Sequence, residues 1–491
     1  MLWYWQEDGG SSLTQSFMAI AEQRHKVPKL SKRVLKVFFE DTLCKFLRFL
    51  LSKGIGDKLL REIKKLSFTL TFAFKKRNMK KQLIIIAMTL FAITAVAQEE
   101  NQFTVDAQLR TRGEYNNGAV TPRSEGEQPA TYINNRARIS LGYQRKDNLE
   151  MRLSVQHTGI WGQSGINANG GDFTVNEAWA KLRFGQGFFA QIGRQQLAYD
   201  DERILGGLDW HVAGNWHDAL RLGYENQQNR LHMIVAFNQS TANNHGNYYN
   251  GPMPYKSMQT LWYHYQAADM PLGISLLAMN LGREAGQAGN GKTRYMQTFG
   301  TDLSYKPSDF DVHGAFYYQT GKNPAGTKVS AWMASAKVGY QINPVWSVNA
   351  GYDYRSGNDG EGTKDKAFDQ LFGSHHMFYG AMDYFTRNVP LGLHDIQAGI
   401  GARGARNTNV QLGYHYFASA EKASNAKRGL GHEVDLQVST RLMKDVTLMA
   451  GYSTMFGTET MDAVMGGNHK SWQDWAWVSF NINPRIFTAK W

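Results

Sequence analysis

Long segments of this chain alternate between apolar and polar side chains, and this period of two constrains the fold more than any other feature. In the segment 103–110 every second residue is apolar, namely Phe103, Val105, Ala107 and Leu109. In an extended chain, the polar residues between them face the opposite way. Such alternation predicts β-strands with one apolar and one polar face.

The predicted strands are longer than those of most soluble proteins. Soluble strands have about 5–6 residues, whereas a strand that crosses a bilayer at about 45° needs about 9–11. We expect about eighteen strands, at 102–115, 132–146, 148–161, 173–185, 188–196, 217–227, 230–239, 257–267, 272–282, 294–306, 310–320, 328–342, 345–356, 393–402, 408–418, 430–443, 445–456 and 472–483.

Short and long connections alternate between these strands. Short turns include 146–148, 185–187 and 444–445, and the longer segments include 116–131, 162–172, 197–216, 240–256 and 457–471. This rhythm is typical of an outer-membrane barrel, with short periplasmic turns and long outer loops. We therefore predict an all-β fold, a transmembrane antiparallel β-barrel of about 18 strands. A soluble all-β protein is the alternative that the alternation alone leaves open.

The segment 357–392 decides the strand count. Residues 377–385, MFYGAMDYF, could form one more strand, which would give nineteen and reverse the order of short and long connections after it. Bacterial barrels have an even number of strands. We therefore expect 357–392 to be one long loop that folds into the barrel opening, with 197–216 as a second candidate constriction.

Residues 79–97, MKKQLIIIAMTLFAITAVA, have the three parts of a secretory signal peptide. The basic pair Lys80 and Lys81 precedes an apolar run, and the small residues 95–97 form a cleavage site. Cleavage would leave 98–491 as the mature barrel domain in the outer membrane. A transmembrane helix is the alternative, but the apolar run is shorter than the ~20 residues that a helical span needs.

Residues 1–78 precede this signal, and we interpret them as a wrongly assigned start of translation. A basic amphipathic helix on a membrane surface is the alternative. Residues 1–97 hold 18 of the 54 lysines and arginines but only 7 of the 42 aspartates and glutamates. The chain's net charge of +12 therefore lies almost wholly in this part, and we expect no nucleic-acid partner. The one cysteine, Cys44, also lies here, which leaves the mature chain without disulfide or thiolate chemistry.

The polar faces of the first six predicted strands carry many basic residues. A charge on the lipid face of a barrel costs about 2–4 kcal/mol at mid-depth, so the polar faces should line the lumen. The basic residues placed inside are Arg110, Arg112, Arg136, Arg138, Arg152, Lys181, Arg183 and Arg221. The acids on the same faces are fewer, namely Asp106, Glu150, Glu177 and Glu225. Such an arc predicts a wet pore that concentrates anions and offers bidentate contacts to carboxylates. Salt-bridge ladders that only stiffen the wall are the alternative.

Other candidate sites are less specific. The run Asp200-Asp201-Glu202 could bind calcium, and His375 with His376 could ligate a metal, but solvated carboxylates and loop packing are the readings we favour. No serine has the context of a nucleophile elbow. We expect neither an enzyme nor a cofactor nor a metal. A structural or adhesive barrel and an outer-membrane lipid hydrolase are the alternatives.

Several motifs resemble those of the alginate export family of outer-membrane porins. They are GRQQL, DERILG and DW within 193–210, NRAR at 135–138, FGSH at 372–375, YGAMDYF at 379–385 and YHYF at 414–417. The resemblance covers 98–491 and implies an eighteen-stranded monomeric barrel that passes an anionic uronate polysaccharide through an arginine-lined pore. It implies pore roles for Arg136, Arg138, Arg152, Arg183 and Arg194. It also implies a gate in 357–392, which contains His375, His376 and Asp383.

Together these features predict a passive outer-membrane channel with anion preference for acidic saccharides. The inner acids, and the few arginines in the second half of the barrel, depart from a strongly electropositive conduit. A broader anion or oligosaccharide porin therefore fits the residues equally well. The expected partners are outer-membrane lipid and an anionic saccharide or small anionic solute.

Overall fold

The computed structural model describes residues 101–166, 171–360, 362–423 and 427–491. The chain divides into two compact units, 1–97 and 98–491, and the described residues belong to the second. The predicted signal peptide 79–97 and the extension 1–78 lie outside the described residues.

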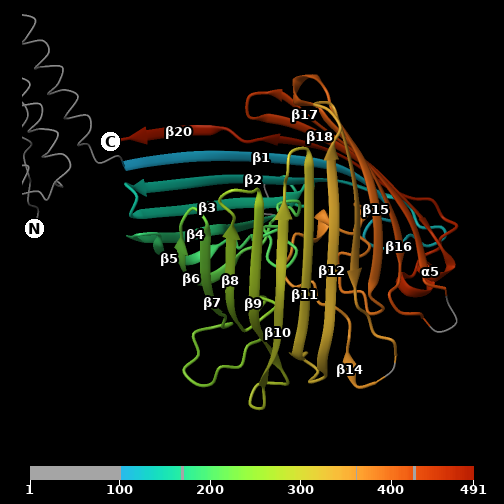
Figure 1. The fold of residues 1–491 in the computed structure, drawn as a ribbon, viewed down its shortest axis with the longest axis horizontal. Helices are drawn as coiled ribbons and strands as arrows, with labels where there is room; N and C mark the ends of the chain where they lie inside the picture. Colours follow the sequence, from blue (N-terminus) through green and yellow to red (C-terminus); the bar gives the residue numbers. More distant parts are fainter. Residues whose placement is uncertain (1–100, 167–170, 361, 424–426) are drawn as a thin grey trace, which may run out of the picture. The chain divides into compact units, whose positions relative to one another are not determined.

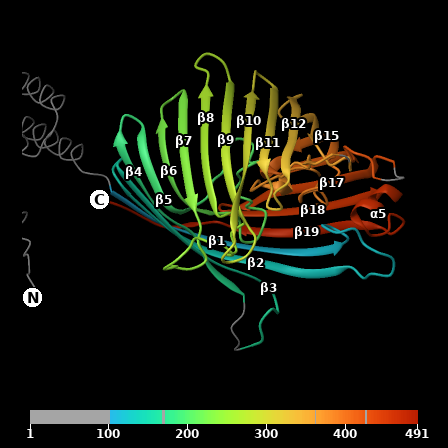
Figure 2. The ribbon, with the colours of Figure 1, turned by 90° about the horizontal axis from the view of Figure 1, so that it is seen from below.

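The described residues form a closed antiparallel β-barrel of 18 strands, which confirms the predicted fold class (Figures 1 and 2). The wall strands are β1 (Asn101–Asn117), β2 (Ala130–Arg145), β3 (Leu149–Ile160), β4 (Asp172–Gly185), β5 (Phe188–Gln195), β6 (His217–Glu225), β7 (Asn229–Phe237), β8 (Ser257–Gln266), β9 (Leu272–Ala285), β10 (Lys292–Tyr305), β11 (Phe310–Lys322), β12 (Lys328–Gln341), β13 (Trp346–Arg355), β15 (Leu393–Arg403), β16 (Asn409–Ala418), β17 (Gly429–Met443), β18 (Val446–Gly457) and β19 (Gln473–Ile482).

The barrel closes where its last strand pairs with its first. β19 runs antiparallel to β1, with Leu109 opposite Ile482 and Asn117 opposite Asp474. Each other wall strand pairs with the next along the chain, so Figure 1 shows them in sequence order around the barrel. Closure leaves no unpaired edge among the 18 described wall strands, and a bilayer could not hydrate such an edge.

The C-terminal end departs from the prediction. The last strand was expected to end at 483, but the chain resumes pairing with the start of β1 as β20 (Arg485–Lys490). Pro484 lies between the two pieces and has no N–H to give to the ladder. Its carbonyl accepts from Ala107 N at 2.9 Å, so the break is local and the pairing continues beyond it.

The segment 357–392 stays outside the barrel wall, as expected. β13 pairs directly with β15, which leaves residues 356–392 as one connection between neighbouring strands. This connection contains the two-residue strand β14 (Lys364–Asp365) and the 3₁₀ turn η2 (His375–Met377). Two further short elements are the 3₁₀ turn η3 (Ala405–Asn407) and the helix α5 (Glu459–Met465).

The two faces of the wall differ as the alternation predicts. Apolar side chains such as Ile139, Leu153 and Phe299 are exposed on the outside, where a barrel contacts hydrocarbon. Their neighbours Ser140 and Ser154 are buried and bond to each other across β2 and β3. No helix among the described residues is long and apolar enough to cross a membrane.

One tight turn depends on glycine. Gly187, between β4 and β5, has φ of +89°, and a Cβ there would lie 2.2 Å from the carbonyl oxygen of Glu225. Both facts exclude a larger residue without movement of the backbone. The turn lets β4 fold back onto β5 at the end of the barrel that carries the short connections.

A charge placed on the outer face should weaken the barrel. Ile139 is 42% exposed and pairs with Ala107 and Val155 near the middle of β2. We expect Ile139→Lys to lower the free energy of unfolding in lipid vesicles by about 2–4 kcal/mol, because the ammonium group would lie in hydrocarbon. Denaturant titration measures the change.

The matched control is Glu125→Lys, which adds a lysine in the exposed β1–β2 loop. It should leave the free energy of unfolding almost unchanged. Equal losses in both variants would contradict the assignment of the outer face.

Candidate functional site: the barrel lumen

Two long loops fold into the barrel and contact each other. They are the β5–β6 loop, residues 196–216, and the β13–β15 loop, residues 356–392. Gly206 N donates to Phe372 O at 3.0 Å, and Phe372 N donates to Ile204 O at 3.1 Å. We call these two loops the loop pair. Because the two loops share backbone hydrogen bonds, a movement of one strains its contact with the other.

A serine strengthens this contact. Ser374 Oγ donates to Glu202 Oε2 at 2.6 Å and accepts from Leu208 N at 2.8 Å. The loops also approach closely at Gly373, where a Cβ would lie 2.2 Å from Arg203 O. A side chain at position 373 would therefore push the loops apart.

The first two strands hold the tip of the β5–β6 loop. Arg136 Nη2 lies 2.7 Å from Asp209 Oδ1, and Arg110 Nη1 lies 3.5 Å from Asp209 Oδ2. Arg110 also donates to the carbonyl oxygens of Trp210 and His211, at 3.2 and 3.0 Å. These arginines therefore point inward, where the sequence placed them, and they bind the loop.

The remaining predicted basic residues fall into two groups. Four pair with carboxylates across or along the strands: Arg152 with Glu177 at 2.7 Å, Arg183 with Glu150 at 2.7 Å, Arg194 with Asp218 at 2.9 Å, and Lys181 with Glu225 at 3.9 Å. Arg112 bonds Glu114 at 2.8 Å and lies over the ring of Trp210. These pairs neutralise part of the arc, as the alternative of salt-bridge ladders anticipated.

Two arginines of the arc have no carboxylate partner among the described residues. Arg138 donates to the amide oxygen of Gln156, at 2.6 and 3.0 Å. Arg221 donates to Gln191 Oε1 and to the hydroxyl of Tyr199. An amide oxygen or a hydroxyl satisfies the N–H groups but leaves the positive charge in place.

A second region of the wall anchors the loop pair from another side. Arg203, in the β5–β6 loop, lies 3.1 Å from Asp353 on β13 and 2.9 Å from Asp201. It also donates to the hydroxyl of Tyr379 at 3.0 Å. On β17, Glu433 accepts from Met382 N at 2.8 Å. The loop pair is thus tied to both the basic arc and this second region.

The second region contains several buried carboxylates, which the sequence analysis did not single out. The strands β10 to β17 bury the carboxylates of Asp302, Asp353, Asp395 and Glu433. These residues lie on the polar faces of predicted strands, so the alternation could have placed them inside. We call this part of the lumen the acidic region, in which Arg203 and Lys337 pair with Asp353 and Arg355 is also buried.

The residues expected in a gate have separate partners. His376 stacks on Trp210 with ring centroids 4.1 Å apart, and its Nδ1 lies 2.8 Å from Asp383 Oδ1. His375 Nε2 bonds Gln370 O at 3.1 Å. Burial lowers the pKa of His375, which favours the neutral ring. The stack joins the β13–β15 loop to the β5–β6 loop.

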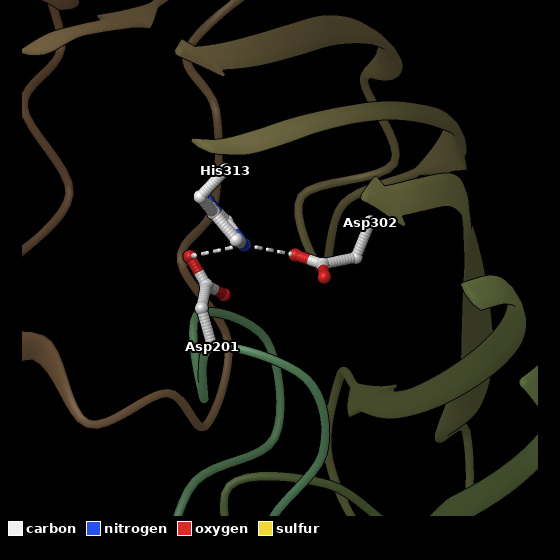
Figure 3. A group of neighbouring side chains, drawn as sticks. All are labelled: Asp201, Asp302 and His313. Atoms are coloured by element: carbon white, nitrogen blue, oxygen red, sulfur yellow. Dashed lines mark hydrogen bonds and ion pairs between the residues drawn. The ribbon is translucent and has the colours of Figure 1, made fainter. Parts of the chain in front are cut away.

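Figure 3 shows the described cluster that could hold a metal ion: Asp201, Asp302 and His313, whose ligand atoms lie within 4.8 Å of one another. His313 Nε2 lies 2.7 Å from Asp302 Oδ2 and 3.8 Å from Asp201 Oδ2. Arg203 also pairs with Asp201. His313 and Arg203 both contact Asp201, so the cluster links the β5–β6 loop to the wall.

The acidic run considered for calcium is divided among different contacts. Asp200 accepts from Trp262 Nε1, Asp201 pairs with Arg203, and Glu202 accepts from Ser374. These three residues therefore have separate protein partners, and the favoured interpretation of solvated carboxylates is replaced by loop contacts. Asp302 and His313 could not have been joined to it from the sequence, because they come from β10 and β11.

A water-accessible cavity of about 700 Å³ lies below the loop pair, at the end with the short turns. Arg110, Arg112 and Asp209 line it at the basic arc. Much of the remaining lining is uncharged and polar, including Gln108, Asn349, Gln397, Gln411, Gln437 and Asn481. Such a lining suits a hydrated, hydroxyl-rich solute better than an apolar one.

A closed barrel with an apolar exterior, a polar lumen and inward-folded loops defines an outer-membrane porin. Residues 101–463 match the family model described as alginate export. The chain therefore belongs to the alginate export family. No curated protein matches the sequence.

Solved structures share the fold at low sequence identity. OccAB1 of Acinetobacter baumannii is 12% identical with a TM-score of 0.56, covering 78% of this chain and 97% of that one. OccK9 (OpdG) of Pseudomonas aeruginosa is 12% identical with a TM-score of 0.55, covering 79% and 98%. OpdO of Pseudomonas aeruginosa is 10% identical with a TM-score of 0.55, covering 78% and 98%.

The lowered pKa of His375 predicts a loss of stability in acid. A histidine whose pKa is depressed in the folded state binds fewer protons there than in the unfolded chain, so stability falls as the pH drops below the ordinary histidine pKa of about 6.5. We expect His375→Gln to remove part of this loss, because Gln can still donate to Gln370 O. Denaturant titration at pH 7.5 and pH 5.5 measures the effect.

His245→Gln is the matched control, because His245 is exposed in the β7–β8 loop. It should keep the acid sensitivity of the unchanged protein. The same sensitivity in His375→Gln would show that the burial of His375 does not contribute.

Proposed function

We propose that the protein is a passive, anion-preferring channel of the outer membrane, for acidic saccharides such as uronate oligomers or polysaccharides. It works as a monomeric barrel without catalysis, cofactor or metal. The fold and the family are those of transport porins. To this, the proposal adds the class of solute that the channel conducts.

The basic arc on β1–β6 is the observation that carries the proposal. It keeps positive charge at Arg138 and Arg221, neither of which has a carboxylate within ion-pair distance among the described residues. Charges of one sign that line a narrow wet passage raise the local concentration of the opposite ion. Guanidinium groups also match the planar geometry of a carboxylate.

The ion pairs of the basic arc and the acidic region opposite it limit the expected strength of the anion preference. Because several arginines share their charge with neighbouring acids, the field favours anions without trapping them. A solute that binds too tightly could not leave. This balance supports a channel for small or moderately charged acidic saccharides over a strongly electropositive conduit.

We place the gate of this channel in the loop pair. His375, His376 and Asp383 lie in the β13–β15 loop, and the stack of His376 on Trp210 ties that loop to its partner. A separation of the loops at this stack would widen the passage between the basic arc and the acidic region.

Reversal potentials across planar bilayers test the anion preference. With the purified protein in a potassium chloride gradient, we expect the reversal potential to shift from zero toward the equilibrium potential of chloride. The double variant Arg138→Gln, Arg221→Gln should lower the anion-to-cation permeability ratio by about twofold or more, because it removes the charges that have no carboxylate within ion-pair distance among the described residues.

Lys306→Gln is the matched control. Lys306 is mostly exposed in the β10–β11 turn and pairs with Asp311 at 3.0 Å, so its loss should hardly change the ratio. Equal permeability of anions and cations in the unchanged protein would reject the proposed function.

A further inference from the structure

Two arginines face each other directly across the first two strands of the barrel. Arg110 on β1 is the register partner of Arg136 on β2. Like charges in directly opposed positions destabilise a sheet. Both side chains are buried, and the Arg136 side chain has no exposed surface. Such a pair requires an anion close by.

Asp209 supplies that anion from the tip of the β5–β6 loop. Each of its oxygens faces a different arginine, with Oδ1 at 2.7 Å from Arg136 Nη2 and Oδ2 at 3.5 Å from Arg110 Nη1. The contact to Arg136 has hydrogen-bond length, whereas the contact to Arg110 is an ion pair, because Arg110 Nη1 donates to the backbone carbonyl oxygen of Asp209. The loop thus fills the position that an external carboxylate would take.

The bridge is open to the lumen on the side of Asp209. The Asp209 side chain is 68% exposed, whereas the two arginine side chains are at most 9% exposed. Arg110 and Asp209 both line the cavity of about 700 Å³. A dissolved carboxylate in that cavity can therefore approach the arginines from the side that Asp209 occupies.

The arginines also keep unused capacity for a ligand. Arg136 Nε is buried and has no hydrogen-bond partner among the described residues. Arg110 also donates hydrogen bonds to neutral carbonyl oxygens of the loop. Hydrogen bonds to an ionised acceptor are stronger than those to a neutral one, so a second carboxylate would bind better than these carbonyls.

We propose that Arg110 and Arg136 form a carboxylate-binding site of the pathway, which Asp209 occupies as an internal ligand until a solute carboxylate from the lumen replaces it. This inference rests on the proposed function and names the group of the solute that is recognised. The exchange involves no covalent change. It frees the Asp209 carboxylate, whereas the loop tip stays bound to Arg110 through the carbonyl oxygens of Trp210 and His211.

Block of the channel current by an oligomer of galacturonate tests the site. A neutral glucose oligomer of the same length is the probe without carboxylates. If Asp209 fills the site about nine-tenths of the time, the apparent affinity for the galacturonate oligomer is reduced about tenfold. We therefore expect Asp209→Asn to lower the half-blocking concentration about tenfold and to leave block by the glucose oligomer unchanged.

Asp435→Asn is the matched control, because Asp435 lines the same cavity in the acidic region. It also removes one negative charge, and it should not lower the half-blocking concentration of the galacturonate oligomer. Adding Arg110→Gln to Asp209→Asn should return the half-blocking concentration to that of the unchanged protein. Heat-modifiable migration in gel electrophoresis shows that each variant forms the barrel.

An unchanged half-blocking concentration in Asp209→Asn would overturn the inference. So would an equal gain in Asp435→Asn, which would reduce the effect to the charge of the lumen as a whole. The proposed function fails on a different result, the absence of anion preference in potassium chloride alone, where no carboxylate is present.

Discussion

The closure of the sheet, β19 against β1, is the constraint on which the rest of the structure depends. It pairs the backbone groups that hydrocarbon could not satisfy and fixes two faces for each strand. The alternation of the sequence then has one outcome, apolar residues outside and charges inside. Without closure, neither the basic arc on β1–β6 nor the acidic region on β10–β17 would face a common lumen.

The lumen in turn explains why the long loops fold inward. A wall with buried guanidinium and carboxylate groups must satisfy them, and the loops bring the partners: Asp209 for Arg110 and Arg136, and Arg203 for Asp353. The contacts that hold the loop pair therefore use the charges that a solute would meet. In the proposed function, structural ion pairing and solute recognition are two uses of the same groups, and they compete.

The sequence predicts the wall well and the site only in part. Period-two alternation is a property of each strand, so strand positions and inward-facing arginines such as Arg136 could be read from it. The bridge of Asp209 and the cluster of Asp302 with His313 join segments that are distant in the chain, and no local pattern encodes such contacts. β20 was missed because Pro484 interrupts the ladder, although the pairing resumes after it.

A structure of the protein with a bound galacturonate oligomer tests the central claim most directly. The account places one carboxylate of the oligomer between Arg110 and Arg136, with the Asp209 carboxylate withdrawn from both. An oligomer bound elsewhere in the lumen, with Asp209 still bridging the two arginines, would contradict it.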